Sequence, residues 1–399
     1  MKIERVKYKD IEQIPRLKVN KNFKQDFQGS APAPFIGRFG YPNVNIGLLS
    51  PQVIDDSPIY DSPKHWSQSN TKIGEVASLR YGLVNSRKKW KIKNQEGRFL
   101  EIIQEVGMAK KAAELEVNLK KIPKLEIKSE KEIIPWGPAS EMVRARITSN
   151  TKIDNRVDKI VSDTDLKAAS GILNLYKKGF EENSLTKLIS VGNLGLKRTR
   201  KLVPTRWSIT AVDDTIGKQL IKEIKDYSVG EYQLHFGGGW GNYYLLLFFP
   251  EVWSYELFET YLHKPVNPWS KRNYRYSTDY ESYQGRKTYA EETAGGYYAA
   301  RLPILEKMKN SKRQGACLAL RFISPEYNVP LGVWVCREAA RKSVQEKGLQ
   351  FSSQEAMLEY ARELIQNNFN FDLNLLLNES KLLKEKKNQT KLTFFLPHQ

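Results

Sequence analysis

The chain has 399 residues, which is enough for two or three domains with hydrophobic cores. Apolar residues make up 40% and charged residues 27%, a balance that indicates a globular protein and excludes a wholly disordered one. Lysine and arginine number 64 against 45 acidic residues, and the formal charge of +19 favours a polyanionic partner such as DNA over the alternative of a merely soluble basic protein.

The first residues and the longest apolar run argue against export and against a membrane partner. Residues 1–5 mix charges without an apolar core, and the run 243–250 is shorter than the ~20 residues of a membrane helix. We therefore expect a cytoplasmic protein associated with the nucleoid. Cys317 and Cys336 have no Cys or His at metal-ligand spacing, so the sequence predicts neither a zinc finger nor a disulfide framework.

The first half of the chain is predicted to alternate loops, helices and one strand. Residues 30–63 are rich in glycine, proline and asparagine, which predicts an ordered loop. Residues 104–119 and 158–176 have helical spacing. Residues 206–212 alternate like a strand and residues 215–227 place apolar side chains on one helical face, so a strand leading into a helix is predicted.

The second half is predicted to alternate short strands and helices. Strands are predicted at 232–236, 243–249, 316–323 and 331–336, the first two joined by a glycine-rich loop, and a helix at 290–309. A last helix is predicted to begin at Ser352, with Glu355 completing a capping box. Beyond Asn378, residues 379–391 contain five lysines and two acids, which is typical of a solvated tether. The expected fold is a mixed α+β globular body with a flexible C-terminal tail.

The last residues of the chain contain a candidate docking peptide. Its key positions are Gln389, Leu392, Phe395 and Leu396. Spacing by three residues places side chains on one side of a 3₁₀ turn, so the leucines and Phe395 would form one apolar plug beside the glutamine. The pattern resembles the PCNA-interacting motif, and the sliding clamp PCNA is therefore the expected partner. The alternative is a terminal strand or helix end packed on the core.

Three clusters of cations with nearby aromatic residues predict contact with DNA, because cations bind phosphates and flat rings stack on unpaired bases. They span residues 87–93, 197–201 and 269–276. The expected phosphate-binding residues are Lys197, Arg198, Arg200, Lys201 and Arg206. We prefer Arg198 and Arg206 among them, because the predicted strand that follows would hold them in position. Each cluster alone also fits a solvated surface.

Asp213 and Asp214 are the candidate catalytic residues. They lie at the predicted junction of strand and helix, where nucleases hold a metal ion such as Mg²⁺ or Mn²⁺ between carboxylates. The alternative is an ordinary helix N-cap, and no sequence distance supports Glu291 and Glu292 as further metal ligands. The glycine-rich segments that begin at Gly37 and Gly237 leave a phosphate site open, although neither matches a P-loop or a dinucleotide fingerprint.

Longer blocks of sequence resemble the archaeal Nre family of DNA repair proteins. The resemblance lies in residues 35–47, 61–66 and 202–214 and in the segment that begins at Gly237, and it extends over residues 30–345 and the C-terminal peptide. It implies a role in DNA repair and PCNA binding through that peptide. It also implies regions 1–288 and 289–378, followed by tether and peptide in 379–399. A cysteine-rich N-terminal element is absent from the sequence, so the resemblance implies no zinc-dependent role.

Taken together, these patterns predict a repair factor that PCNA recruits to damaged or branched DNA, with metal-dependent DNA processing left open. The alternatives are a non-catalytic repair adaptor and a nucleotide-binding enzyme that acts on a small phosphate ligand.

Overall fold

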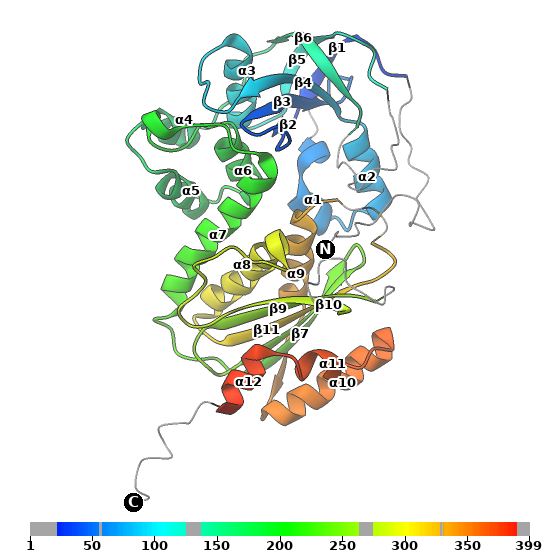
Figure 1. Ribbon diagram of the computed structural model, residues 1–399, viewed down its shortest axis with the longest axis vertical. Helices are drawn as coiled ribbons and strands as arrows, with labels where there is room; N and C mark the ends of the chain where they lie inside the picture. Colours follow the sequence, from blue (N-terminus) through cyan, green and yellow to red (C-terminus); the bar gives the residue numbers. More distant parts are fainter. Residues whose placement is uncertain are drawn as a thin grey trace, which may run out of the picture. The chain divides into compact units, whose positions relative to one another are not determined.

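The computed structural model describes residues 22–55, 58–124, 137–262, 274–327, 329 and 331–388, and its helices and mixed sheets confirm the α+β class (Figure 1). Two compact units divide the chain. The N-terminal unit contains the described residues up to Gln219 together with those between 328 and 338, and the C-terminal unit contains Leu220–Tyr327 and the residues from Ala339 onward. The boundary expected near residue 288 concerns sequence regions and stays a prediction.

A six-stranded sheet forms the centre of the N-terminal unit, in the order β1-β5-β6-β4-β3-β2. Its strands are β1 (Asp26–Ala31), β2 (Ala33–Ile36), β3 (Asn43–Ser50), β4 (Val84–Lys91), β5 (Ala113–Leu119) and β6 (Ala139–Ile147). Only the pairing of β4 with β6 is parallel among these described strands. Residues 30–63, expected as loop, therefore contain the end of β1 and all of β2 and β3.

The N-terminal unit also contains helices and 3₁₀ turns. They are η2 (Pro58–Asp61), α1 (Pro63–Gln68), α2 (Ile73–Tyr81), α3 (Arg98–Met108), α4 (Asn155–Ser162), α5 (Ala168–Lys177), α6 (Glu182–Ser190) and η3 (Lys197–Thr199). Of these, α3 and α6 contact the strands of the sheet. The helix expected over 104–119 is wrong beyond α3, because β5 buries every second side chain from Ala113 to Leu119 against the core. The helical spacing at 158–176 belongs to two helices, α4 and α5.

The long helix α7 (Thr205–Ile224) replaces the strand that we predicted over 206–212. Buried residues recur along it at every fourth position, at Ser208, Val212, Ile216, Leu220 and Ile224, and Asp213 and Ile221 are buried beside them. That spacing is the buried stripe of a single helix. In the first turns of α7, Thr, Ile and Val alternate with other residues as they would in a strand. A stretch of seven residues is too short to distinguish the strand period of about 2 residues from the helical period of about 3.6.

The C-terminal unit also contains a six-stranded sheet, in the order β10-β9-β11-β8-β7-β12. Its strands are β7 (Tyr232–Gly239), β8 (Asn242–Phe249), β9 (Ser254–Tyr261), β10 (Tyr276–Glu281), β11 (Ala316–Ile323) and β12 (Leu349–Phe351). The predicted strands at 232–236, 243–249 and 316–323 are confirmed. Trp240 and Gly241 form a two-residue turn between β7 and β8 with φ angles of 53° and 69°, so the three glycines before them belong to β7 rather than to a loop.

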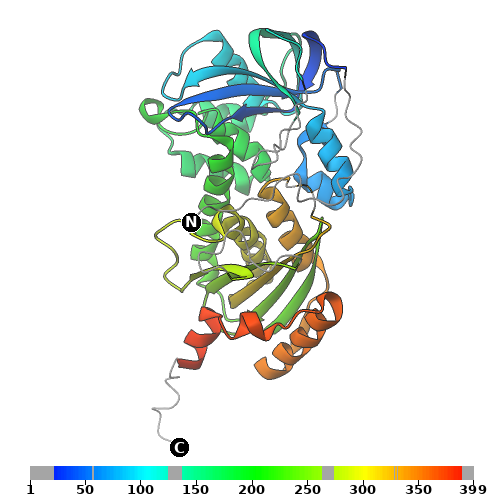
Figure 2. The same cartoon turned by 45° about the vertical axis from the view of Figure 1, so that its right-hand side comes forward.

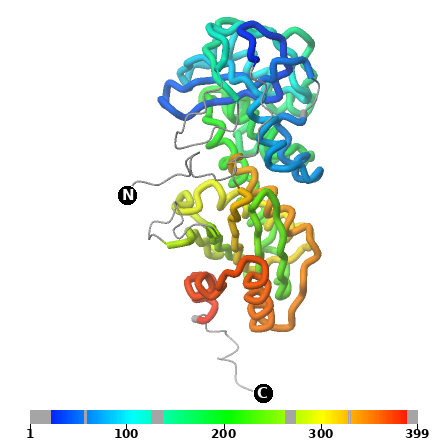
Figure 3. Tube along the Cα trace, turned by 90° about the vertical axis from the view of Figure 1, so that its right-hand side faces the viewer, coloured from blue at the N-terminus to red at the C-terminus, as the bar shows by residue number. Residues whose placement is uncertain are grey.

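Helices cover both faces of this second sheet (Figure 1, Figure 2). They are α8 (Ala294–Ser311), α9 (Trp334–Gln345), α10 (Gln354–Phe369), α11 (Asn374–Leu377) and α12 (Lys381–Asn388). The helices α10, α11 and α12 gather on the face opposite to α8, as the orange and red end of the chain shows in Figure 3. Because both faces are covered, every residue of the central strand β11 is buried.

Three expectations for this half require correction. The segment 331–336 contains the start of helix α9 and not a strand. Ser353, rather than Ser352, caps α10, and its side chain accepts a hydrogen bond from the Ala356 amide. Residues 381–388 are not tether, because α12 buries Leu382 and Leu383 in the core of the C-terminal unit.

Among the described residues, no helix is both long enough and apolar enough to span a membrane.

Candidate nucleic-acid interface

A tight turn between β2 and β3 presents two exposed aromatic rings. Phe39 is 72% exposed and Tyr41 47% exposed. The turn is closed by the hydrogen bonds from the Gly37 amide to the Asn45 carbonyl and from the Asn43 amide to the Gly40 carbonyl, both 2.8 Å. Gly40 has a φ of 81°, and a Cβ there would lie 2.6 Å from the Asn43 carbonyl oxygen. The local sequence therefore builds an ordered support for the two rings.

The first turn of α7 adds a third exposed ring beside this turn. Trp207 is 45% exposed, and the centroid of its ring lies 5.3 Å from that of Tyr41. The Ile36 amide donates a 3.0 Å hydrogen bond to Thr205 Oγ1, which joins the end of β2 to the start of α7. The side chains of Phe39, Tyr41 and Trp207 thus come together from two sequence blocks separated by more than 160 residues.

Exposed cations accompany these rings because three backbone segments run side by side. The Ile92 amide donates to the Pro42 carbonyl and the Leu202 amide donates to the Ile92 carbonyl, each over 3.0 Å. Lys91 and Lys93 flank Ile92, and Lys201 precedes Leu202; all three are exposed. Arg206, in the first turn of α7, is also exposed. We call the rings and cations at this place the basic aromatic surface; its members are Phe39, Tyr41, Lys91, Lys93, Lys201, Arg206 and Trp207.

The structure places the other predicted phosphate-binding residues in different settings. Lys197 and Arg198 are exposed on η3. The Arg200 guanidinium is half-buried and donates to the carbonyl oxygens of Gly195 and Val161, each over 2.8 Å, so it ties its segment to α4. Burial also lowers the pKa of Arg200. In the cluster at 87–93, Trp90 packs against Phe99 and is not an open stacking surface.

Asp213 and Asp214 lie inside α7 and not at a junction of strand and helix. Asp213 is completely buried, and its Oδ1 accepts a 2.6 Å hydrogen bond from Nη1 of Arg337, which is buried too. Asp214 pairs with Lys218 one turn later, over 2.6 Å. Their position within the helix and their pairing with Arg337 and Lys218 fit neither a metal site at the end of a strand nor a helix N-cap. In the part of the chain that the structure describes, no three His, Cys, Asp or Glu side chains are grouped to hold a metal ion. The catalytic assignment stays a prediction.

The block around Asp61 and Trp66 performs an internal role. Asp61 accepts from Arg80 Nη1 over 2.5 Å and from Asn183 Nδ2 over 2.9 Å, which ties η2 to α2 and α6. Trp66 is fully buried, donates to the Ile59 carbonyl and packs its ring 5.2 Å from that of Trp334. These residues hold the N-terminal unit together.

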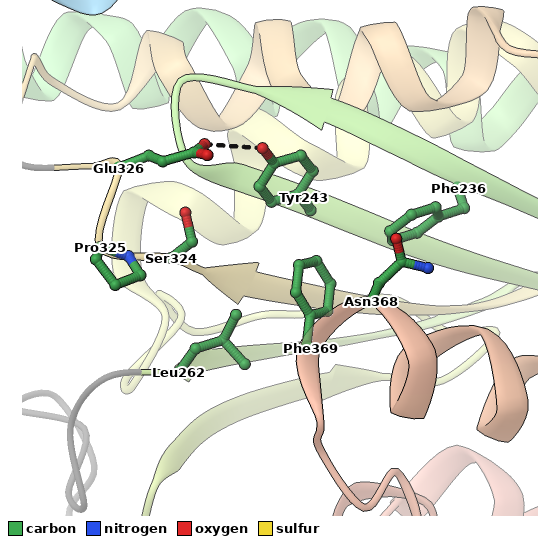
Figure 4. A pocket seen from close by; sticks show the side chains of 8 residues that line it. All are labelled: Phe236, Tyr243, Leu262, Ser324, Pro325, Glu326, Asn368 and Phe369. Atoms are coloured by element: carbon green, nitrogen blue, oxygen red, sulfur yellow. Dashed lines mark hydrogen bonds between the residues drawn. The ribbon is translucent and has the colours of Figure 1, made fainter.

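A separate pocket of about 500 Å³ lies in the C-terminal unit (Figure 4). It is lined by Phe236, Tyr243, Leu262, Ser324, Pro325, Glu326, Asn368 and Phe369. The Tyr243 hydroxyl donates a 2.8 Å hydrogen bond to Glu326 Oε2, and burial together with this carboxylate raises the pKa of Tyr243 to about 12. Our reading of the sequence missed this pocket, because its walls come from two strands, a turn and the end of α10.

Two groups of predicted site residues lie outside the described residues. They are the clamp-binding residues Gln389, Leu392, Phe395 and Leu396, and residues 269–273 of the third basic cluster.

Known proteins resemble the chain over most of its length. A sequence profile described as "Archaeal Nre, N-terminal" matches residues 8–270, and one described as "Archaeal Nre, C-terminal" matches residues 281–395. The chain is 33% identical over 380 residues to DNA repair protein NreB of Archaeoglobus fulgidus, with 94% of each chain covered. It is 34% identical over 329 residues to DNA repair protein NreA of Haloferax volcanii, which covers 80% of this chain and 78% of the relative. No solved structure matches the chain significantly.

Proposed function

Because the chain belongs to the archaeal Nre family of DNA repair proteins, we propose that it is a repair factor that binds DNA through the basic aromatic surface of its N-terminal unit. The observation that carries the proposal is the grouping of three exposed rings with exposed lysines and an arginine. Large apolar rings are normally buried, and a cluster of exposed ones marks an interaction site.

The chemistry of this surface favours DNA with unpaired bases. Cations bind phosphates of any sequence, whereas Phe39, Tyr41 and Trp207 offer π faces that bases inside a duplex do not reach. Stacking on such a ring contributes about 1–3 kcal/mol per base. Damaged and branched DNA contain unstacked or unpaired bases, so the surface supports binding to those structures in preference to intact duplex.

Binding of labelled single-stranded, forked and duplex oligonucleotides, measured by fluorescence anisotropy at 50 and 200 mM salt, tests this function. We expect Trp207→Ala to weaken binding of forked and single-stranded DNA about 5- to 100-fold, with a smaller effect on duplex. Affinity of the unchanged chain should fall steeply with salt, because bound cations release counterions from DNA. Tyr289→Ala removes an exposed ring of the C-terminal unit and serves as the control. Equal binding by the Trp207 variant and the unchanged chain would refute the proposed surface.

The same proposal includes recruitment by PCNA through the C-terminal peptide. The motif begins at Gln389, immediately after Asn388, the last residue of α12. Since Leu382 and Leu383 are part of the core, the folded C-terminal unit continues to the edge of the motif. PCNA bound at this peptide would therefore hold the C-terminal unit close to the clamp. This tethering would raise the effective concentration of the protein at the DNA that the clamp encircles.

A further inference from the structure

We propose that the pocket of the C-terminal unit, here called the aromatic pocket, binds a single unpaired nucleobase of DNA. The inference rests on the proposed function, because it needs a chain that meets DNA with unpaired bases. It assigns a second contact, in a different unit and with different chemistry from the basic aromatic surface. Its support comes from the rings, the buried hydroxyl and the charge of the lining residues.

Three rings from three elements shape the pocket for a flat ligand. Phe236 on β7 and Tyr243 on β8 are nearly parallel, with an angle of 24° and 6.5 Å between their centroids. Phe369, at the end of α10, lies 5.5 Å from Tyr243 and 6.0 Å from Phe236, and it is inclined by 50° and 66° to them. Rings arranged in this way offer both a face and an edge to a planar group. The volume of about 500 Å³ falls within the range of small-ligand sites.

A buried hydroxyl supplies a point of polar recognition inside the pocket. Ser324 is only 8% exposed, and its Oγ has no hydrogen-bond partner among the described residues. Figure 4 shows Ser324 beside the Tyr243 ring, with its hydroxyl directed to the side of Glu326 and away from Leu262. A buried hydroxyl without a partner destabilises the fold. The edge of a nucleobase carries both donors and acceptors and would satisfy it.

The charge of the lining favours the base over the phosphate of a nucleotide. Among the described residues that line the pocket, Glu326 carries the one charge and no lysine or arginine is present. A carboxylate repels phosphate but accepts hydrogen bonds from exocyclic amino groups. The Asn368 side chain donates to the Leu364 carbonyl, and its own amide oxygen is a further acceptor. We therefore expect adenine, cytosine and guanine to bind better than thymine, which has no amino group.

The walls of the pocket are held in place without a ligand. The Ser324 amide donates a 2.9 Å hydrogen bond to the Gly241 carbonyl, which fixes the turn after β11 against the tip of the β7–β8 hairpin. Gly241 is packed so closely that a Cβ there would lie 2.3 Å from the Tyr327 amide nitrogen. The Tyr243–Glu326 hydrogen bond joins the same two segments (Figure 4). A preformed site loses little ordering free energy when it binds.

The test uses the full chain and single-stranded oligonucleotides that contain one 2-aminopurine, whose fluorescence is quenched on stacking. We expect saturable quenching with single-stranded DNA and none with the same base in a duplex. Phe369→Leu keeps apolar packing but removes the ring, and it should lower the affinity measured by this quenching roughly 5- to 100-fold. Ser324→Ala removes only the hydroxyl and should weaken it roughly 3- to 10-fold, the effect of one hydrogen bond. Tyr289→Ala changes an exposed ring outside the pocket and should leave the quenching unchanged, and circular dichroism checks the fold of each variant.

The outcomes separate the pocket from the proposed function. Absence of any oligonucleotide binding by the unchanged chain overturns the proposed function. Oligonucleotide binding that Trp207→Ala weakens, with quenching that neither Phe369→Leu nor Ser324→Ala alters, overturns the pocket and leaves the function standing. A parallel titration with the free 2-aminopurine nucleoside distinguishes the source of the base. Saturable binding of that nucleoside, without quenching in the oligonucleotide, overturns the assignment to DNA.

Discussion

Asp213 and Arg337 meet in the interior of the N-terminal unit although 124 positions of sequence separate them. Removing one charge of a buried pair leaves the other uncompensated, which typically costs 3–5 kcal/mol. We expect Asp213→Asn to lower the free energy of unfolding by about 3–5 kcal/mol in a urea titration. Asp214→Asn, the matched control, breaks a more exposed pair with Lys218 and should cost less than about 1 kcal/mol.

The two single variants also test the catalytic assignment of these carboxylates. An Asp213 variant with unchanged stability, combined with loss of a Mg²⁺- or Mn²⁺-dependent activity, would contradict the structural role and restore the catalytic one.

His235 is a single residue that should make stability depend on pH. Burial, and next to it the charge of Lys307, lowers the pKa of His235 from 6.5 to about 4, and the ring contacts the Glu346 carbonyl through Nδ1. The folded state thus favours the neutral ring. This contribution to stability is complete above pH 6.5 and is lost as the pH falls towards 4.

We expect the free energy of unfolding to fall by roughly 1–2 kcal/mol between pH 7 and pH 4.5 on account of His235, less than the full shift because solvent screens part of it. His235→Gln should reduce the slope of stability against pH over that range. His65→Gln changes an exposed histidine and serves as the control. Parallel curves for the chain and its His235 variant would show that the ring is not held neutral.

At the scale of elements, α12 is attached through the buried carboxylate of Glu256. This side chain accepts hydrogen bonds from Ser380 Oγ over 2.6 Å and from the amides of Lys381 and Leu382 over 3.0 Å. An anion at a helix N-terminus satisfies amides that have no partner within the helix. One residue of β9 therefore anchors the N-terminus of α12 to the sheet.

Glu256→Ala should therefore loosen α12 and cost about 1–3 kcal/mol, the usual range for a buried charged hydrogen bond. Limited trypsin digestion followed by mass spectrometry should show faster cleavage after Lys384 and Lys386. Glu379→Gln removes only an exposed ion pair with Lys384 and should digest like the unchanged chain. Unchanged cleavage in the Glu256 variant would mean that Leu382 and Leu383 alone hold the helix.

At the scale of the whole molecule, recruitment and DNA contact should be separable. Burial of Leu392, Phe395 and Leu396 in a clamp contributes roughly 4.5–9 kcal/mol before the ordering cost. Ordering the peptide costs about 2–5 kcal/mol of that gain, so binding in the micromolar range is expected. We expect Phe395→Ala with Leu396→Ala to abolish binding to PCNA in calorimetry while the anisotropy titrations with DNA are unchanged.

Phe394→Ala provides the control for this experiment, because the motif leaves its position free. It should retain most of the clamp affinity. The recruitment proposal fails if the unchanged chain gives no heat with PCNA.

The sequence by itself determined what depends on local pattern and on long blocks of similarity. The β7–β8 hairpin follows from two apolar strands joined by a glycine-rich segment, and the start of α10 follows from a serine cap. The family follows from blocks such as residues 202–214. Net charge indicated a polyanionic partner. These features need only neighbouring residues or composition, so no tertiary contact was required to read them.

The tertiary structure decided what depends on partners far away in the chain. From the sequence, Asp213 resembles a metal ligand or a helix cap, whereas the structure pairs it with Arg337. Leu382 resembles part of a solvated tether, whereas the structure buries it in the core of the C-terminal unit. The contact of Tyr41 with Trp207 is of the same kind. Local periodicity does not determine which distant surface buries a side chain, because the free energy of that burial comes from the partner.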